Sequence, residues 1–226
     1  MLYLILGSVI SLSFFRPSPH ASPSKNINGD RASYEAVTGE SADEDRTVWD
    51  SFYKNKSHIY GKEAIAYLQE NIDLIPKGRA FVPAMGEGRN AIYLAKKGFN
   101  VDGNDISDVA VDKALAEAKL QHVTIKANIV DLKLYSYPEN YYDFILMSLF
   151  YDKELLPHLK KALKKGAYIM FYAKVELKGV RDNSPSDFAV KAGELKEAVK
   201  EYQIIKPYQE FVDHGIRVAT ILAKKP

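Results

Sequence analysis

The residues most able to do chemistry form a glycine turn that is followed by acids at fixed distances. The segment VPAMGEGRN, residues 82–90, contains Gly86 and Gly88 after an apolar run. Glycines there let the backbone turn sharply and let a ligand approach it without a Cβ in the way. Asp105 lies 17 residues after Gly88, where a carboxylate can accept hydrogen bonds from both hydroxyls of a ribose. Asp131 comes after the next apolar run, where an acid could accept from an adenine amino group. This pattern indicates a nucleotide-type ligand at the carboxyl edge of a sheet.

Strands that alternate with helices must position these residues. Short apolar runs predict strands at residues 79–84, 99–104, 123–127, 142–150, 168–174, about 203–210 and 216–223. Helical spacing predicts helices at residues 64–71, 90–97, 107–118, 152–163 and 195–202, with Ser107 as an N-cap and Gly166 as the stop of the fourth. This alternation predicts a Rossmann-like three-layer α/β sandwich with a mostly parallel, seven-stranded sheet. The turn at residues 213–215 predicts a closing hairpin, which makes the last strand antiparallel.

Composition divides the chain into three parts. Residues 1–15 carry no charge and read as an apolar anchor or a signal-like segment, although they are shorter than the roughly 20 residues of a spanning helix. Residues 16–47 are rich in small and polar residues and predict a flexible linker. Residues 48–226 form the predicted folded domain.

The overall counts exclude several classes of function. The chain has no cysteine, so it has no disulfide, thiolate zinc site or thiol nucleophile. With 31 basic and 29 acidic residues the net charge is +2, which gives no electrostatic case for nucleic-acid binding. No acid–base dyad and no metal-ligand cluster stands out, so the sequence assigns no catalytic residue and no metal.

The segment GRAFVPAMGEGRNAIYLAKKGFNVDGNDIS, residues 78–107, resembles motif I and its acidic partner in class I S-adenosylmethionine-dependent methyltransferases. Within that superfamily, GEGRNAIYLAKKGF is similar to the tellurite-resistance methyltransferases of the TehB type. The resemblance continues in WDSFYKNKSHIYG upstream and in PENYYDFILMS, KKALKKGAYIMF, AGELKEAV and VATILAKK downstream, so it covers about residues 49–225.

The resemblance implies a class I methyltransferase fold, S-adenosylmethionine as cofactor and a small-molecule acceptor. Carried over residue by residue, it implies cofactor contacts by Ala84, Met85, Gly86, Glu87, Gly88, Arg89, Asn90, Asp105, Ile106, Val130, Asp131, Met147 and Ser148. Tyr53 and Tyr60 take the place of the segment that closes over the site, and with Tyr151 they are the side chains that we expect to enclose the acceptor. The acceptors that the resemblance implies include a soft anion such as tellurite or selenite, and a thiol.

Two residues depart from the family pattern. The family usually has an acid at the position of Val82 and a glycine at the position of Ala84. The acid normally helps to organise the glycine loop and the amino end of the ligand. We expect Ala84 to be the milder change as long as its φ stays negative.

Two other functions stay open on the sequence. A non-catalytic nucleotide-binding or scaffold protein on the same fold would explain Val82 and Ala84, and a nicotinamide-dependent oxidoreductase could use the same glycine turn. Because the methyl donor is cytosolic, the methyltransferase hypothesis predicts a cytoplasmic domain, either free or tethered through residues 1–15. Arg16 and Lys25 on the C-terminal flank of that segment agree with such a tether.

Overall fold

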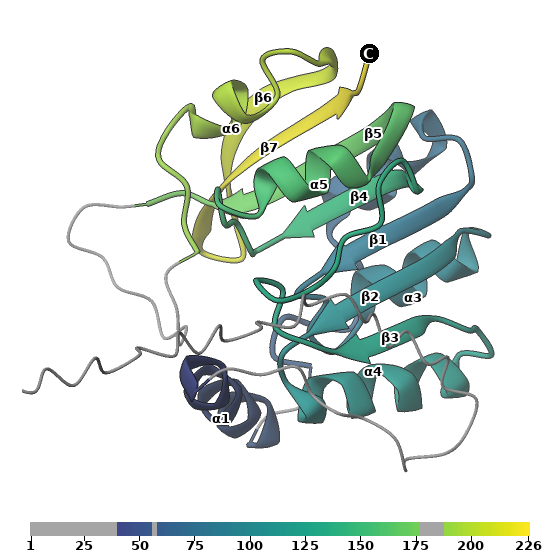
Figure 1. The fold of residues 1–226 in the computed structure, drawn as a ribbon, viewed down its shortest axis with the longest axis vertical. Helices are drawn as coiled ribbons and strands as arrows, with labels where there is room; N and C mark the ends of the chain where they lie inside the picture. Colours follow the sequence, from purple (N-terminus) through teal and green to yellow (C-terminus); the bar gives the residue numbers. More distant parts are fainter. Residues whose placement is uncertain (1–39, 56–57, 177–187) are drawn as a thin grey trace, which may run out of the picture.

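The chain folds into a seven-stranded sheet with helices on both faces (Figure 1). The computed structural model describes residues 40–55, 58–176 and 188–226. The segment at 1–15 that the sequence predicts as an anchor or signal, and the predicted linker as far as residue 39, lie outside the described residues. Within the described part of the chain, no helix is long and apolar enough to cross a membrane.

The strand order is β3-β2-β1-β4-β5-β7-β6. The strands are β1 (Arg79–Pro83), β2 (Asn100–Asp105), β3 (Lys126–Ile129), β4 (Tyr142–Ser148), β5 (Leu163–Lys174), β6 (Gln203–Asp213) and β7 (Ile216–Lys224). The pairs among β1 to β5 are parallel, whereas β7 runs antiparallel to both β5 and β6. The order changes direction between β1 and β4, and at such a switch point parallel sheets bind ligands. The predicted architecture, including the antiparallel last strand, is confirmed.

The helices cover the sheet in two layers. They are α1 (Glu40–Lys54), α2 (Ala66–Asn71), α3 (Arg89–Lys96), α4 (Asp108–Leu120), α5 (Leu156–Ala162) and α6 (Glu194–Ala198), with a 3₁₀ turn η1 (Ile72–Leu74). One apolar core joins the sheet to α2, α3 and α4, and a second joins it to α5 and α6. Ser107 caps α4 as predicted, because its hydroxyl accepts the backbone N–H of Ala110.

Helix α1 corrects the predicted boundary of the linker. It begins at Glu40, so residues 40–47 are helical, although the sequence places them in the linker. Its first part is rich in acids and small residues, which hides a helix whose later residues are aromatic. The helix lies beside the N-terminal end of α4 and outside the carboxyl edge of the sheet (Figure 1). It is therefore placed where a ligand at this edge would be covered.

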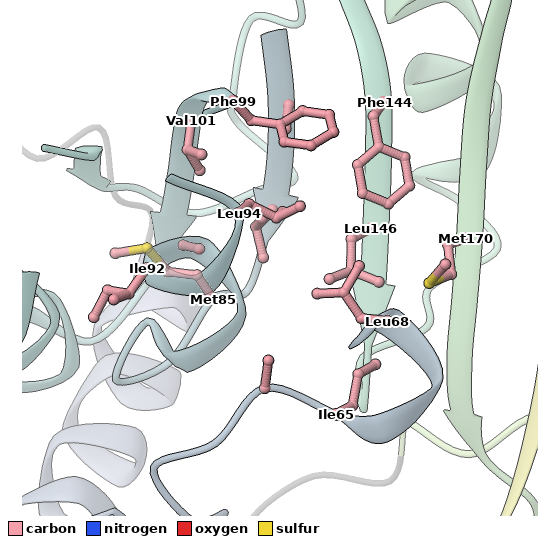
Figure 2. Close-up of a cluster of buried hydrophobic side chains, with 14 of the residues drawn as sticks. Ile65, Leu68, Met85, Ile92, Leu94, Phe99, Val101, Phe144, Leu146 and Met170 are labelled. Carbon is pink, nitrogen blue, oxygen red and sulfur yellow. The ribbon is translucent and has the colours of Figure 1, made fainter. Parts of the chain in front are cut away.

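Strand β4 separates the two cores. Phe144 and Leu146 point into the first core, whereas Ile145 and Met147 point into the second, and all four side chains are fully buried. Figure 2 shows Phe144 and Leu146 facing Leu68 of α2 and the side chains of α3. This alternation explains the almost continuous apolar run in the sequence, since a strand covered on both faces needs apolar residues at every position.

The end of α5 differs from the prediction. The sequence predicts a helix that runs to Gly166, but α5 ends at Ala162 and β5 begins at Leu163. Lys225 explains the change: its ammonium donates to the carbonyls of Lys160 and Leu163, and its backbone pairs with Gly166 and Ala167. Strand β3 also begins later than predicted, at Lys126 instead of Val123, because its register with β2 starts at Asp102.

We predict that Leu146→Ala lowers the free energy of unfolding by about 2–5 kcal/mol, because it leaves a cavity in a closely packed core. Leu134→Ala is the matched control, since Leu134 is largely exposed, and we expect a change within about 0.5 kcal/mol. Equilibrium unfolding in urea measures both. Equal effects of the two substitutions would contradict the position of Leu146 in the core.

Candidate active site

The ends of β1, β2, β3 and β4 border a cavity of about 490 Å³. That volume is within the range of roughly 300–1,000 Å³ that is usual for small-molecule sites. The carboxyl ends of parallel strands meet at one edge, so residues far apart in the sequence come together here. The predicted cofactor residues that line the cavity are Ala84, Met85, Gly86, Glu87, Arg89, Asn90, Asp105, Ile106, Val130, Asp131 and Ser148.

The two glycines of the turn are needed for different reasons. Both have positive φ, 56° at Gly86 and 80° at Gly88. A Cβ on Gly86 would lie 2.8 Å from the hydroxyl of Tyr53, inside the cavity lining. A Cβ on Gly88 would lie 2.7 Å from the Cβ of Ala114, so this glycine lets α3 pack closely against α4. Gly88 itself does not line the cavity, so its place in the structure is at the contact between α3 and α4.

Ala84 adopts a backbone conformation that the sequence analysis did not expect. Its φ is +48°, in the left-handed region where the family has glycine. For a residue with a Cβ this conformation costs roughly 1–2 kcal/mol. The neighbouring hydrogen bonds hold it in place: Met85 N–H donates to the carbonyl of Asn104 at 3.0 Å, and Gly86 N–H donates to Asp105. The turn therefore keeps the shape of a glycine turn without the first glycine.

Asp105 is the best-defined polar group of the site. Its buried carboxylate accepts the N–H of Gly86 at 2.7 Å and the N–H of Ser107 at 3.0 Å. Burial raises the pKa of Asp105 to about 6, and these hydrogen bonds partly oppose the rise. The carboxylate thus joins the turn after β1 to the start of α4 and still borders the cavity.

Three side chains of the motif residues GEGRN bind the preceding segment of the chain. Glu87 accepts the N–H groups of His58 and Ile59 at 3.0 Å each, and Arg89 donates to the carbonyl of Tyr60. A third residue, Asn90, accepts the N–H of Ile65 at 3.0 Å through its side-chain oxygen. They line the cavity as predicted, but in this structure their polar atoms hold residues 58–65 in place. No pattern in the sequence indicates this role.

One face of α1 forms a wall of the cavity. Asp45, Trp49 and Tyr53 are spaced four residues apart and all line it. Tyr53 was predicted to lie at the site, as was Tyr60, which also lines the cavity. Asp45 and Trp49 were missed, although the four-residue spacing back from Tyr53 could have found them.

Two predicted residues near the end of β4 do not line the cavity. Met147 is fully buried in the core beneath α5, and the neighbouring Ser148 lines the cavity instead. Tyr151 is buried edge-to-face against Phe171, and burial raises its pKa to about 12. Both side chains therefore pack in the core, and their predicted contacts with cofactor and acceptor stay predictions.

Several residues that line the cavity were not assigned to the site in the sequence analysis. They include His58, Leu149, Phe150 and Phe188. Leu149 has a φ of +55°, and its N–H donates to the carbonyl of Tyr172 at 2.7 Å. A bulky residue in this conformation is strained and such strain concentrates at functional sites. The sequence signal for Phe150 is its position at the end of the apolar run that begins with β4.

The electrostatics of the cavity combine a neutral phenol with a desolvated cation. Burial raises the pKa of Tyr53 well above its ordinary value, and the carboxylates of Asp105 and Glu87 add to the rise. Burial also lowers the pKa of Arg89. Among the described residues, Arg89 has no carboxylate within ion-pair distance. No group of three or more His, Asp or Glu side chains that could hold a metal occurs in the described ranges.

The comparisons with known proteins agree with this geometry. The family model described as "Tellurite resistance protein TehB" matches residues 49–217. The chain belongs to the TehB family. This family membership confirms the resemblance that the motif residues indicated.

Individual relatives are distant. A probable S-adenosyl-L-methionine-dependent methyltransferase TehB of Haemophilus influenzae is 27% identical over an alignment of 158 positions, gaps included, and the match covers 62% of this chain and 54% of the relative. This chain therefore matches about half the length of that TehB protein. Hemagglutinin 1 of Eikenella corrodens is 22% identical over an alignment of 210 positions, gaps included, and the match covers 83% of this chain and 69% of the relative.

Among solved structures, the crystal structure of TehB from Haemophilus influenzae has a TM-score of 0.63 at 20% identity. The match covers 79% of this chain and 67% of that one. It confirms a class I methyltransferase fold for this TehB family member.

We predict that Ala84→Gly leaves the free energy of unfolding unchanged or raises it by up to about 1 kcal/mol. Relief of the strained φ outweighs the greater freedom that glycine has in the unfolded chain, which costs about 0.4–1 kcal/mol. Ala80→Gly in β1 is the matched control, since Ala80 has no positive φ, and we expect it to destabilise. Urea unfolding compares the two variants. A loss at position 84 as large as that at position 80 would contradict the strain.

We predict that the pH dependence of stability exposes the raised pKa of Asp105. With a pKa of about 6 when folded and about 3.9 when unfolded, the folded state binds more protons between these values. The contribution of this group to stability therefore rises as the pH falls through 6. Relative to Asp105→Asn, wild type should gain about 1 kcal/mol between pH 7 and pH 5. Urea unfolding of both proteins at the two pH values tests this, and a difference that stays constant would contradict the shift.

Proposed function

We propose that this domain transfers the methyl group of S-adenosylmethionine to a small-molecule acceptor. The observation that carries the proposal is Asp105, whose carboxylate borders the cavity next to the glycine turn. A carboxylate here can accept hydrogen bonds from the two hydroxyls of a ribose that lies over the turn. Membership of the TehB family and the name of its Haemophilus influenzae relative support the same reaction.

The residues present fit this cofactor along most of its length. The absence of a Cβ at Gly86 lets the Tyr53 hydroxyl pack close against the turn. We place the methionine portion along the part of the cavity that Met85 and Gly86 line. Ile106 and Val130 line the cavity beside Asp131, as an adenine site requires. The fit is poorest at the position of Val82, which lines the cavity but offers no carboxylate to the amino end of the ligand.

The cofactor brings an activated methyl group, so the protein has to position the acceptor and keep water out. Helix α1 covers the edge of the sheet, and the Tyr53 hydroxyl lies over the glycine turn. An acceptor that is already an anion, such as a thiolate, tellurite or selenite, needs no general base. This agrees with a site for which we assign no acid–base dyad. The proposal implies a cytoplasmic location, because the methyl donor is made in the cytoplasm.

Two alternatives have weaker support. An oxidoreductase needs a group that handles a hydride, and the sequence after the fourth strand shows no Ser-Tyr-Lys or histidine-based motif. A non-catalytic protein would follow from Val82 and Ala84, yet the turn keeps its left-handed shape at Ala84. Restoring both residues with Val82→Asp and Ala84→Gly separates this alternative. Cofactor affinity that appears only in the double variant would favour a protein that has lost the activity.

We predict that S-adenosylhomocysteine binds wild type and that Asp105→Asn weakens the affinity about 10- to 100-fold. Hydrogen bonds to a charged group contribute about 1.5–3 kcal/mol, and 1.4 kcal/mol corresponds to a factor of ten. Asp73→Asn on the exposed turn η1 is the matched control and should bind like wild type. Isothermal titration measures the affinity, and conversion of S-adenosylmethionine in the presence of tellurite measures the activity. The absence of any binding to wild type would refute the proposed function.

A further inference from the structure

We infer that the part of the cavity next to β4 and β5 is an acceptor subsite for small, flat aromatic molecules, walled by Trp49, Phe150 and Phe188. This inference rests on the proposed function and adds a substrate class to it. An aromatic wall binds a flat ring by stacking, and such contacts contribute about 0.5–1.5 kcal/mol beyond burial.

The position of these residues separates them from the nucleotide side of the cavity. Asp105 ends β2, Ile106 follows it, and Asp131 lies just beyond β3, all at one side of the switch point between β1 and β4. Phe150 follows β4, on the other side. Phe188 comes just before the bridge that joins Val190 to Val175 beyond β5. A ligand whose nucleotide portion lies over β2 and β3 therefore leaves the aromatic end for the acceptor.

The rings form a continuous group. Phe150 and Phe188 have ring centroids 4.7 Å apart, and Phe188 stacks on Trp49 with centroids at 6.4 Å and an interplanar angle of 15°. Trp49 in turn stacks on Tyr53 with centroids at 5.9 Å. Since all four residues line the cavity, the group presents aromatic surface to it from α1, from the segment after β4 and from the segment before α6.

Polar contacts hold the wall of α1 in place. Asp50 accepts the hydroxyl of Ser107 at 2.5 Å and the N–H of Val109 at 3.4 Å, at the N-terminal end of α4. Lys113 donates to the carbonyl of Tyr53 and pairs with Glu87 at 3.2 Å. Trp49 is thus part of an ordered surface that is anchored to the glycine turn itself.

The chemistry of methyl transfer suits an aromatic thiol as the acceptor. Its thiolate sulfur forms the new bond to the methyl carbon while the carbon–sulfonium bond breaks. The electron pair of that bond stays on the sulfonium sulfur, which becomes the neutral thioether of S-adenosylhomocysteine. No base is needed once the thiol is ionised, and no other co-reactant takes part.

The emission of Trp49 tests the inference directly, because it is the single tryptophan of the chain. The full chain, saturated with S-adenosylhomocysteine, is titrated with benzenethiol or with cyclohexanethiol, which has the same size but is not flat. We expect benzenethiol to change the emission and to bind about 2- to 10-fold more tightly, the ratio that corresponds to the stacking contribution. Equal affinities for the two thiols would overturn the inference.

Phe188→Leu keeps an apolar side chain of similar size and removes the ring. We expect it to raise the Kd of benzenethiol about 2- to 10-fold and to abolish the preference over cyclohexanethiol, because the stacking contribution is lost. Its affinity for S-adenosylhomocysteine stays at the wild-type value. Phe211→Leu is the matched control, an exposed aromatic on the edge strand β6, and should change neither affinity. A preference for benzenethiol that survives in Phe188→Leu would also overturn the subsite.

The cofactor site and the aromatic subsite are tested separately. Isothermal titration with S-adenosylhomocysteine precedes the thiols and decides whether the cofactor site exists. If no cofactor binds, the proposed function fails, and the thiol titration of the free protein still decides whether a flat ring binds at Trp49. If the cofactor binds and the ring does not, the aromatic subsite alone is wrong.

Discussion

The bond from the Gly86 N–H to the Asp105 carboxylate holds the site together. It joins the turn after β1 to the end of β2, and the same carboxylate also accepts the N–H of Ser107 at the start of α4. The carbonyl of Asp105 accepts the N–H of Val130, which brings in the end of β3. One residue thus fixes three of the loops that line the cavity. Burying a carboxylate costs free energy, as its raised pKa shows, and the two N–H groups offset part of that cost.

The positions of residues 58–65 and of α1 also depend on this turn. Because α3 starts directly after it, Glu87 and Asn90 reach the backbone of residues 58–65 and fix the wall opposite the sheet. Lys113 links Glu87 to the end of α1. The motif residues that carry the family resemblance therefore build the enclosure as well as the floor of the site. A change in the glycine turn would be transmitted to α1 through these contacts.

The sequence predicted the order of elements because their apolar periods are strong, but it could not place every residue. Met147 and Ser148 differ by one position, and only the register of β4 decides which of them meets the cavity and which the core. Gly166 is a reasonable end for a helix when only its neighbours are considered. Its N–H, however, bonds to the carbonyl of Lys225, about sixty residues later, so that Gly166 is part of β5. The four-residue spacing places Trp49 on the same helix face as Tyr53, but local sequence does not show that α1 folds back over the edge of the sheet.

The two departures from the family pattern act on different properties of the turn. Ala84 keeps a φ of +48° although its Cβ opposes it, because hydrogen bonds on both sides determine the conformation. The shape of the turn is therefore preserved at a cost in stability. Val82 is buried in the first core and packs as an apolar residue, so replacing the acid removes a charge without leaving a gap. The difference from the family pattern is therefore a charge that is missing at position 82, while the left-handed turn and the Asp105 carboxylate that joins it are retained.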